Sequence, residues 1–167
     1  DEDGFLTEFK RTKDFENMIA NYTKSKHCII VNNGTISLTL AAIAAGVKAG
    51  DEVIVPNYTM IATPNSVKMF GVNPVFVDVD KDTLCLDIDL VKKAITKKTK
   101  AIMLVSANGR YPKSGIKSFE DLCRKHDIKL IEDAAQSLGS FYPDGRHIGS
   151  AGLVGSFSFS MPKIIST

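Results

Sequence analysis

The sequence predicts an α/β protein built in three layers, with helices on both faces of a mostly parallel central sheet. Short apolar runs alternate with helical patterns along the chain, which is typical of βαβ units around a buried parallel sheet. The length of 167 residues is usual for one domain, and no linker-like segment divides the chain. We therefore expect a single domain over residues 1–167.

The expected elements follow from the hydrophobic period of each segment. Strands are expected at 28–31, 52–55, 74–79, 101–106, 129–132 and 154–158. Helices are expected at 36–45, 62–70, 90–95 and 119–126. An amphipathic helix within residues 7–24 leads into the first strand, with Phe15, Met18, Ile19 and Tyr22 on one face.

Capping residues support these boundaries. Asp87 and Asp89 precede the helical run that begins at Leu90, and Ser118 with Asp121 three residues later resembles a capping box. Three glycines stand where helices are expected to stop, at positions 46, 50 and 71.

The composition gives no sign of a nucleic-acid or membrane partner. Lys and Arg total 21 and Asp and Glu total 19, a net charge of +2, which is too small for an electrostatic footprint. No apolar run is long enough to span a bilayer, and the acidic start is not a signal peptide. We expect a soluble, cytoplasmic domain.

The cysteines and histidines are expected to have structural roles. Cys28, Cys85 and Cys123 are widely spaced without a CxxC pair, which favours free thiols over disulfides or a zinc site. No metal site is expected. The three histidines, at positions 27, 126 and 147, are interpreted as structural or surface residues.

Ligands of open α/β sheets bind beyond the carboxyl ends of the strands, and the candidate residues follow such ends. The turn Asn33-Gly34-Thr35 offers backbone N–H groups at a helix N-terminus, which suit a phosphate. A plain turn in which Asn33 or Thr35 caps the helix is the alternative. Ser158 points off the end of the last expected strand and is a second phosphate candidate, or merely a small residue at a strand end.

Asp133 and Lys163 are the two candidates for covalent chemistry. A lysine that forms a Schiff base and an aspartate that pairs with a pyridinium nitrogen are what a protein supplies to pyridoxal 5′-phosphate (PLP). Asp133 has the alternatives of a helix cap or a metal ligand, although no cluster of ligands accompanies it. Lys163 has the alternative of a solvated side chain.

Phosphate turn, aspartate and lysine occur in an order that resembles the fold-type I PLP enzymes, and more narrowly the DegT/StrS family of sugar aminotransferases. The resemblance covers nearly the whole chain. It lies in Asn33-Gly34-Thr35, 51–56 with Thr59 and Ala62-Thr63, Val77-Asp78-Val79, 131–139, Gly149, Gly155, and Phe157-Ser158-Phe159 before Lys163.

The resemblance implies a role for each matching residue. Lys163 would hold PLP and shuttle a proton, and Asp133 would pair with the pyridinium nitrogen. The phosphate would be bound by Gly34, Thr35 and Ser158, and Gln136 would lie near the ring hydroxyl.

The resemblance further implies an aminotransferase that moves an amino group from L-glutamate, through PLP and its amine form PMP, to a nucleotide-linked keto-sugar. Most such acceptors are 4-keto-6-deoxy sugars, giving products of the perosamine or viosamine type, and the active site lies between the subunits of a homodimer. Two alternatives remain. One is a PLP-dependent sugar dehydratase, but dehydratases on this scaffold carry histidine at the position of Lys163. The other is a non-catalytic regulatory or interaction module.

Three features depart from the family pattern. Met60 stands where an aromatic residue usually stacks on the pyridine ring, and we expect its thioether to cover the ring instead. The loop Ser106-Ala107-Asn108-Gly109-Arg110 replaces a sequence like His-Leu-Tyr-Gly. The family is nearly twice as long and has a small C-terminal domain that this chain lacks, so the 167-residue polypeptide alone is expected to be inactive.

Overall fold

A computed structural model describes residues 9–165 and contains a parallel sheet of five strands. The strands are β1 (Glu52–Pro56), β2 (Asn73–Val77), β3 (Thr99–Val105), β4 (Lys129–Asp133) and β5 (Val154–Ser156). Their order across the sheet is β2-β1-β3-β4-β5, and every neighbouring pair is parallel. The predicted α/β class is confirmed.

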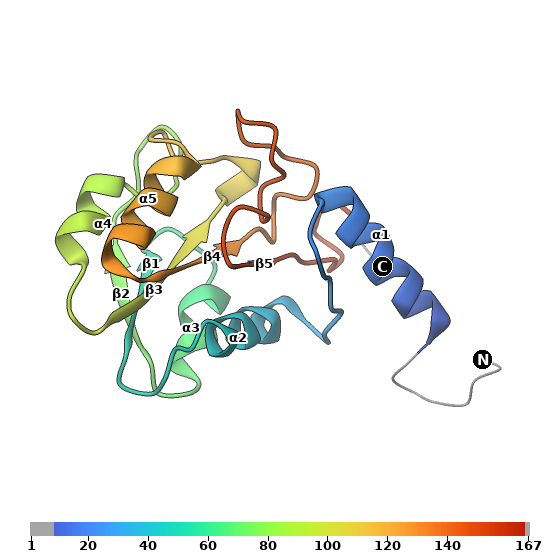
Figure 1. Ribbon diagram of the computed structural model, residues 1–167, viewed down its shortest axis with the longest axis horizontal. Coiled ribbons are helices and arrows are strands. Elements are labelled where there is room, and N and C mark those ends of the chain that lie inside the picture. Colours follow the sequence, from blue (N-terminus) through green and yellow to red (C-terminus); the bar gives the residue numbers. More distant parts are fainter. Residues whose placement is uncertain (1–8, 166–167) are drawn as a thin grey trace.

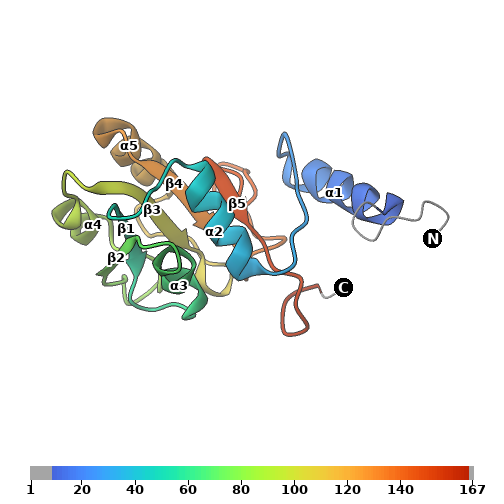
Figure 2. The ribbon, with the colours of Figure 1, turned by 90° about the horizontal axis from the view of Figure 1, so that it is seen from below.

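Helices cover both faces of the sheet (Figures 1 and 2). On one face lie α2 (Gly34–Ala44) and α3 (Ala62–Lys68), and on the other lie α4 (Ile88–Ala94) and α5 (Ile116–His126). Alternate residues of β1 supply the two cores: Val53 and Val55 join the α2 and α3 side, whereas Ile54 joins the α4 and α5 side. This alternation is the two-residue period of a strand, and it confirms the three layers.

The N-terminal helix α1 (Lys10–Thr23) stands at one end of the molecule, outside the layers (Figure 1). Residues 7 and 8 of the predicted helix lie outside the described part of the chain. The shared apolar face is only partly confirmed, because Ile19 is buried but Met18 and Tyr22 are exposed. The ring of Phe15 packs on that of Phe159 with centroids 5.0 Å apart, which joins α1 to the segment after β5.

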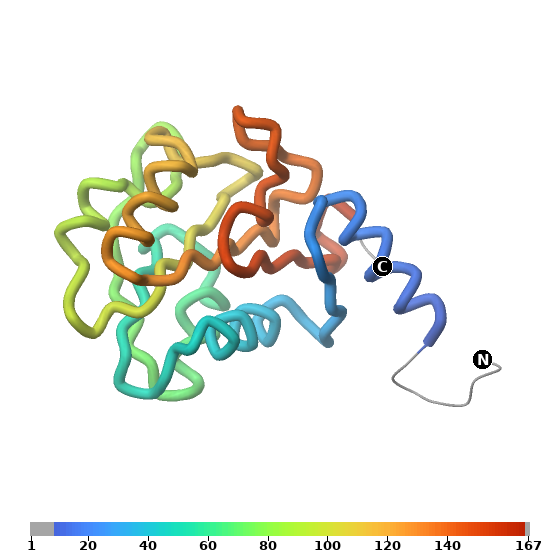
Figure 3. Tube along the Cα trace, viewed as in Figure 1, coloured from blue at the N-terminus to red at the C-terminus, as the bar shows by residue number. Residues whose placement is uncertain are grey.

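The predicted strand at 28–31 was wrong. Within the described residues this run pairs with no strand and forms an extended connection from α1 to α2 (Figure 3). Its Ile30 N–H donates to the Glu16 carboxylate at 3.0 Å, and Ile29 is exposed. An apolar run of four residues has the composition of a strand, but only an adjacent sheet edge makes it one.

The predicted helix caps were right at one helix and wrong at another. Asp87 accepts from the N–H groups of Asp89 and Leu90, so it is the cap and Asp89 lies inside α4. The capping box at Ser118 was wrong because α5 begins at Ile116, three residues earlier than predicted, with Gly115 as its N-cap. Ser118 instead donates its hydroxyl hydrogen to the Ser114 carbonyl at 2.6 Å.

The cysteines are free, as predicted. Burial raises the pKa of the Cys85 thiol to about 11 and that of Cys123 to about 12, which suits unreactive packing residues. Among the described helices, none is long and apolar enough to cross a membrane.

Candidate active site

The topology creates one switch point, between β1 and β3. The chain leaves β1 for β2 on one side and then returns to β3 on the other. Ligand sites of open α/β sheets form at the carboxyl side of such a point. The segments 57–60 after β1 and 106–110 after β3 flank this point, and the residues after Asp133 of β4 and Ser156 of β5 follow along the same carboxyl edge of the sheet.

Asp133 ends β4 and is almost completely buried, with 6% of its surface exposed. Its Oδ2 accepts a hydrogen bond from the Thr63 hydroxyl at 2.7 Å, and its Oδ1 accepts from the Ala135 N–H at 3.2 Å. Burial raises the pKa of the carboxyl, while these two donors and the charge of Lys163 act in the opposite direction. Asp133 is therefore a carboxyl group shielded from solvent at the carboxyl edge of the sheet, and the charge of Lys163 favours its ionised form.

Two threonines support Asp133 in a way that the sequence reasoning missed. Thr63 is fully buried in the first turn of α3, and its hydroxyl also shares a 2.8 Å hydrogen bond with that of Thr59. The signal was present, because both threonines belong to the motif on which the resemblance rests. Their relation to Asp133 could not be read, since 70 positions separate it from Thr63.

The predicted phosphate turn opens α2. The Asn33 side chain caps the helix by accepting from the Ile36 N–H at 2.9 Å, so the capping alternative holds for Asn33. The N–H groups of Gly34 and Thr35 belong to the first turn, where no intrahelical acceptor exists. They remain suited to an anion.

Gly34 brings this turn against Ser158, which lies beyond β5. A Cβ at Gly34 would stand 3.6 Å from the Ser158 Cβ and 3.8 Å from its Oγ. A side chain at position 34 would therefore fill the space between the helix N-terminus and the serine hydroxyl. Two candidates for phosphate binding, 124 positions apart in the sequence, thus lie together in one cradle.

Lys163 is partly buried in a turn beyond β5, and its backbone N–H donates to the Ser160 carbonyl at 2.9 Å. The charge of Lys163 acts to lower the pKa of Asp133, against the larger effect of burial. Gln136 is exposed, and its Oε1 accepts from the Asn108 N–H at 2.8 Å, so it links the loops after β3 and β4. Met60 is 67% exposed beyond β1.

A groove of about 1160 Å³ lies between α1, the connection 24–33 and the segment 149–160. It shares Gly34 and Ser158 with the site but is not lined by Asp133 or Lys163. The candidate catalytic side chains therefore lie outside this groove. In the described part of the chain, no group of three or more His, Cys, Asp or Glu side chains is arranged to hold a metal.

These residues fit PLP. The Gly34–Ser158 cradle suits its phosphate, the buried Asp133 suits a cationic ring nitrogen, and Lys163 supplies an amine. A parallel sheet with a buried aspartate at the end of one strand and a lysine beyond the end of another is the arrangement that a PLP-dependent α/β enzyme requires.

The chain belongs to the DegT/DnrJ/EryC1/StrS aminotransferase family, whose model matches residues 1–167. It is 40% identical to GDP-perosamine synthase of Vibrio cholerae over 92% of this chain and 41% of that protein. It is also 40% identical to L-glutamine:2-deoxy-scyllo-inosose aminotransferase of Streptomyces kanamyceticus, over 92% of this chain and 35% of that protein. The chain thus spans about two fifths of the length of these relatives.

Solved structures agree on the fold. The aminotransferase from Psychrobacter cryohalolentis superposes with a TM-score of 0.90 at 37% identity, over 95% of this chain and 39% of that one. NtdA from Bacillus subtilis, solved with bound cofactor PMP, gives a TM-score of 0.77 at 31% identity, over 80% of this chain and 30% of that one. The recognised family and fold are confirmed.

Proposed function

We propose that the protein containing this chain is a PLP-dependent aminotransferase that delivers an amino group from L-glutamate to a keto group on a nucleotide-linked sugar. The acceptor we propose is a 4-keto-6-deoxy sugar. The observation that carries the proposal is the buried Asp133 carboxylate, hydrogen-bonded by Thr63 and influenced by Lys163. The family membership and the GDP-perosamine synthases among the relatives support it.

Each residue has a proposed role. Bound PLP supplies an aldehyde that takes up the amino group and a ring that delocalises the electron pair left by proton loss. The Nζ of Lys163 would anchor the cofactor and then accept and return that proton. Asp133 would keep the ring nitrogen protonated. Gly34, Thr35 and Ser158 would bind the phosphate, Gln136 would face the ring hydroxyl, and Met60 would cover the ring.

The 167 residues are proposed to be the cofactor-binding domain of that enzyme. The two-fifths coverage of the relatives supports this, as does the exposure of large apolar residues such as Ile29, Met60 and Phe76. We propose that a smaller domain and a second subunit, in a homodimer, complete the substrate site. The 167-residue polypeptide alone is then inactive.

A purified full-length protein tests the cofactor assignment. It should be yellow after PLP addition, and Lys163→Ala should remove the visible band that is typical of a lysine-linked PLP. Lys163→Arg keeps the charge without a reactive amine and serves as the control, also expected to be colourless. Equal spectra for the unsubstituted protein and both variants would refute the assignment of Lys163. That result would favour the alternative of a non-catalytic module.

A second candidate substrate pair follows from the comparisons. An L-glutamine:2-deoxy-scyllo-inosose aminotransferase is as identical to the chain as the Vibrio cholerae GDP-perosamine synthase. The assay should therefore offer glutamate and glutamine as donors, with GDP-, UDP- and dTDP-linked keto-sugars and 2-deoxy-scyllo-inosose as acceptors. Amine product only from the last acceptor would refute the nucleotide-sugar proposal and leave the aminotransferase class intact.

A further inference from the structure

Glu132 is a buried carboxylate to which the proposed chemistry assigns no role. It precedes Asp133 on β4, and successive strand residues face opposite sides of the sheet. Asp133 accordingly bonds Thr63 of α3 on one side. On the other, Glu132 lies in the core on the α5 side, with no exposed surface.

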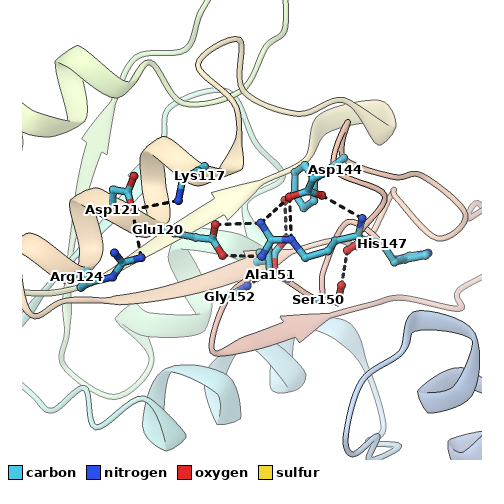
Figure 4. A network of polar contacts seen from close by, with 12 residues as sticks. Lys117, Glu120, Asp121, Arg124, Asp144, His147, Ser150, Ala151 and Gly152 are labelled. Carbon is cyan, nitrogen blue, oxygen red and sulfur yellow. Dashed lines mark hydrogen bonds and ion pairs between the residues drawn. The ribbon is translucent and has the colours of Figure 1, made fainter.

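Four neutral donors satisfy this carboxylate. Oε1 accepts from the Tyr142 hydroxyl at 2.6 Å and from the Gly149 N–H at 2.8 Å. Oε2 accepts from the Ala151 N–H at 2.7 Å and the Gly152 N–H at 2.6 Å. A buried carboxylate is costly unless its lone pairs accept hydrogen bonds. Here all four donors come from residues 142–152, which precede β5, and two of them, Ala151 and Gly152, are labelled in Figure 4.

Gly149 connects this carboxylate to the phosphate cradle. A Cβ at Gly149 would lie 2.5 Å from Phe157 Cζ and 2.9 Å from the Ala134 Cβ, so its backbone is wedged between the residues that follow β4 and β5. A Cβ at Gly155, the sheet partner of Glu132, would overlap the Gly149 carbonyl oxygen. Gly149 therefore lies directly against the ring of Phe157, and Phe157 precedes Ser158 in the chain.

We infer that Glu132 is a positioning residue that, through Gly149 and Phe157, sets the separation of Ser158 from the N-terminus of α2 and so forms the phosphate subsite. This inference rests on the proposed function and deepens it. It predicts that disturbing Glu132 weakens recognition of the phosphate group in particular. It does not predict a general loss of the cofactor site.

Glu132→Gln is the sharpest substitution, because it keeps the shape and replaces one acceptor oxygen by a donor. At Oε2 the amide NH₂ would face two backbone N–H groups. At Oε1 it would face only the Gly149 N–H, because the Tyr142 hydroxyl can accept as well as donate. The amide is therefore expected to turn its NH₂ toward Gly149 and push that residue away.

The experiment compares the binding of PLP and of pyridoxal, which lacks the phosphate, to the full-length protein by visible absorption. Glu132→Gln should weaken PLP binding about tenfold, the effect of one lost charge-assisted hydrogen bond. Pyridoxal binding should change less than about twofold. In a Ser158→Ala background the PLP loss should shrink, because the two changes act on one subsite.

Glu120→Gln is the matched control. Glu120 of α5 forms the bidentate ion pair with Arg146, at 2.6 and 3.0 Å, that holds the outer turn of the same loop (Figure 4). It makes no hydrogen bond to residues 149–152. Glu120→Gln should leave the ratio of PLP to pyridoxal affinity unchanged.

The inference would be overturned if Glu132→Gln weakened PLP and pyridoxal binding equally, or if Glu120→Gln weakened PLP binding as much as Glu132→Gln does. Glu132 would then only stabilise the loop in general. If Glu132→Gln fails to fold, the same binding comparison is made with Tyr142→Phe. This substitution removes one donor to Glu132 and leaves its hydrogen bonds from the backbone N–H groups of Gly149, Ala151 and Gly152. It should show a smaller loss selective for PLP, and a non-selective loss would overturn the inference. If the unsubstituted protein binds neither compound, the proposed function itself fails, and the inference with it.

Discussion

The hydroxyl of Thr63 in α3 donates a 2.7 Å hydrogen bond to Oδ2 of Asp133 at the end of β4. This bond crosses from a helix to the sheet and fixes the direction of a buried acid. Thr59 extends it to the loop after β1. The orientation of the carboxylate that would face a cofactor ring therefore depends on α3, a helix that connects two other strands, β1 and β2.

Thr63→Val should destabilise the cofactor-free protein by about 1–3 kcal/mol, the cost of leaving a buried acceptor unsatisfied. It also removes an influence that lowers the Asp133 pKa, so that pKa should rise further. Thr63→Ser keeps the hydroxyl and should recover most of the loss. Chemical denaturation of the three proteins measures this, and equal destabilisation by Ser and Val would contradict it.

Asp133→Asn should stabilise the cofactor-free protein near pH 7 by about 1 kcal/mol, the order expected for a buried carboxylate with incomplete compensation. The folded pKa of Asp133 is raised by burial. Its penalty is therefore absent below the unfolded value of 3.8 and grows as pH rises through the folded pKa.

Thermal unfolding should accordingly give the Asp133→Asn variant a higher Tm than the unsubstituted protein at pH 7. This difference in Tm should be smaller at mildly acidic pH. The same variant should bind PLP more weakly, because a neutral amide does not hold the ring nitrogen protonated. A lower Tm at every pH would contradict the first expectation.

His147 should make the fold sensitive to acid. Its Nε2 accepts from the Gly139 N–H at 2.8 Å and its Nδ1 bonds the Ile148 carbonyl at 2.6 Å, which requires the neutral ring. Burial lowers its pKa from 6.5. The folded state thus disfavours the proton, so the stability due to His147 is complete above pH 6.5 and lost as pH falls through the lower folded pKa.

His147→Gln is the comparison, because an amide can accept from one neighbour and donate to the other without titrating. Between pH 7 and pH 5 the Tm of the unsubstituted protein should fall more than that of the variant. Parallel curves would show that His147 does not titrate in this range.

Gly149→Ala should destabilise the protein by well over the roughly 1 kcal/mol that a positive φ alone costs an alanine. At φ +99° its Cβ would also meet Phe157 at 2.5 Å. Gly145→Ala, in the same loop at φ +84° with no atom within 4 Å of its Cβ, is the control and should show the conformational cost alone. If urea denaturation gave equal losses of unfolding free energy for the two variants, the Phe157 ring would be able to move aside at no cost.

Much of this architecture could be predicted from local pattern. The alternation of apolar runs and helical segments predicted β1 to β5 and the covering helices to within a few residues, because each needs only its own buried face. The segment 28–31 failed because an apolar run becomes a strand only where a sheet edge is free to pair with it. The capping box of α5 failed because Ser118 and Asp121 have the spacing of such a box but both lie inside the helix.

The sequence by itself determined the chemical groups of this protein: a glycine and hydroxyl turn, a strand-ending Asp133, Ser158 and Lys163, in the order of a PLP-binding family. Only the tertiary structure decided how they act on one another. It set Thr63 on Asp133, Gly34 against Ser158, and four donors around Glu132. These contacts join residues that are up to 124 positions apart in the chain, and pairing across such separations depends on how the layers pack, which no local pattern encodes.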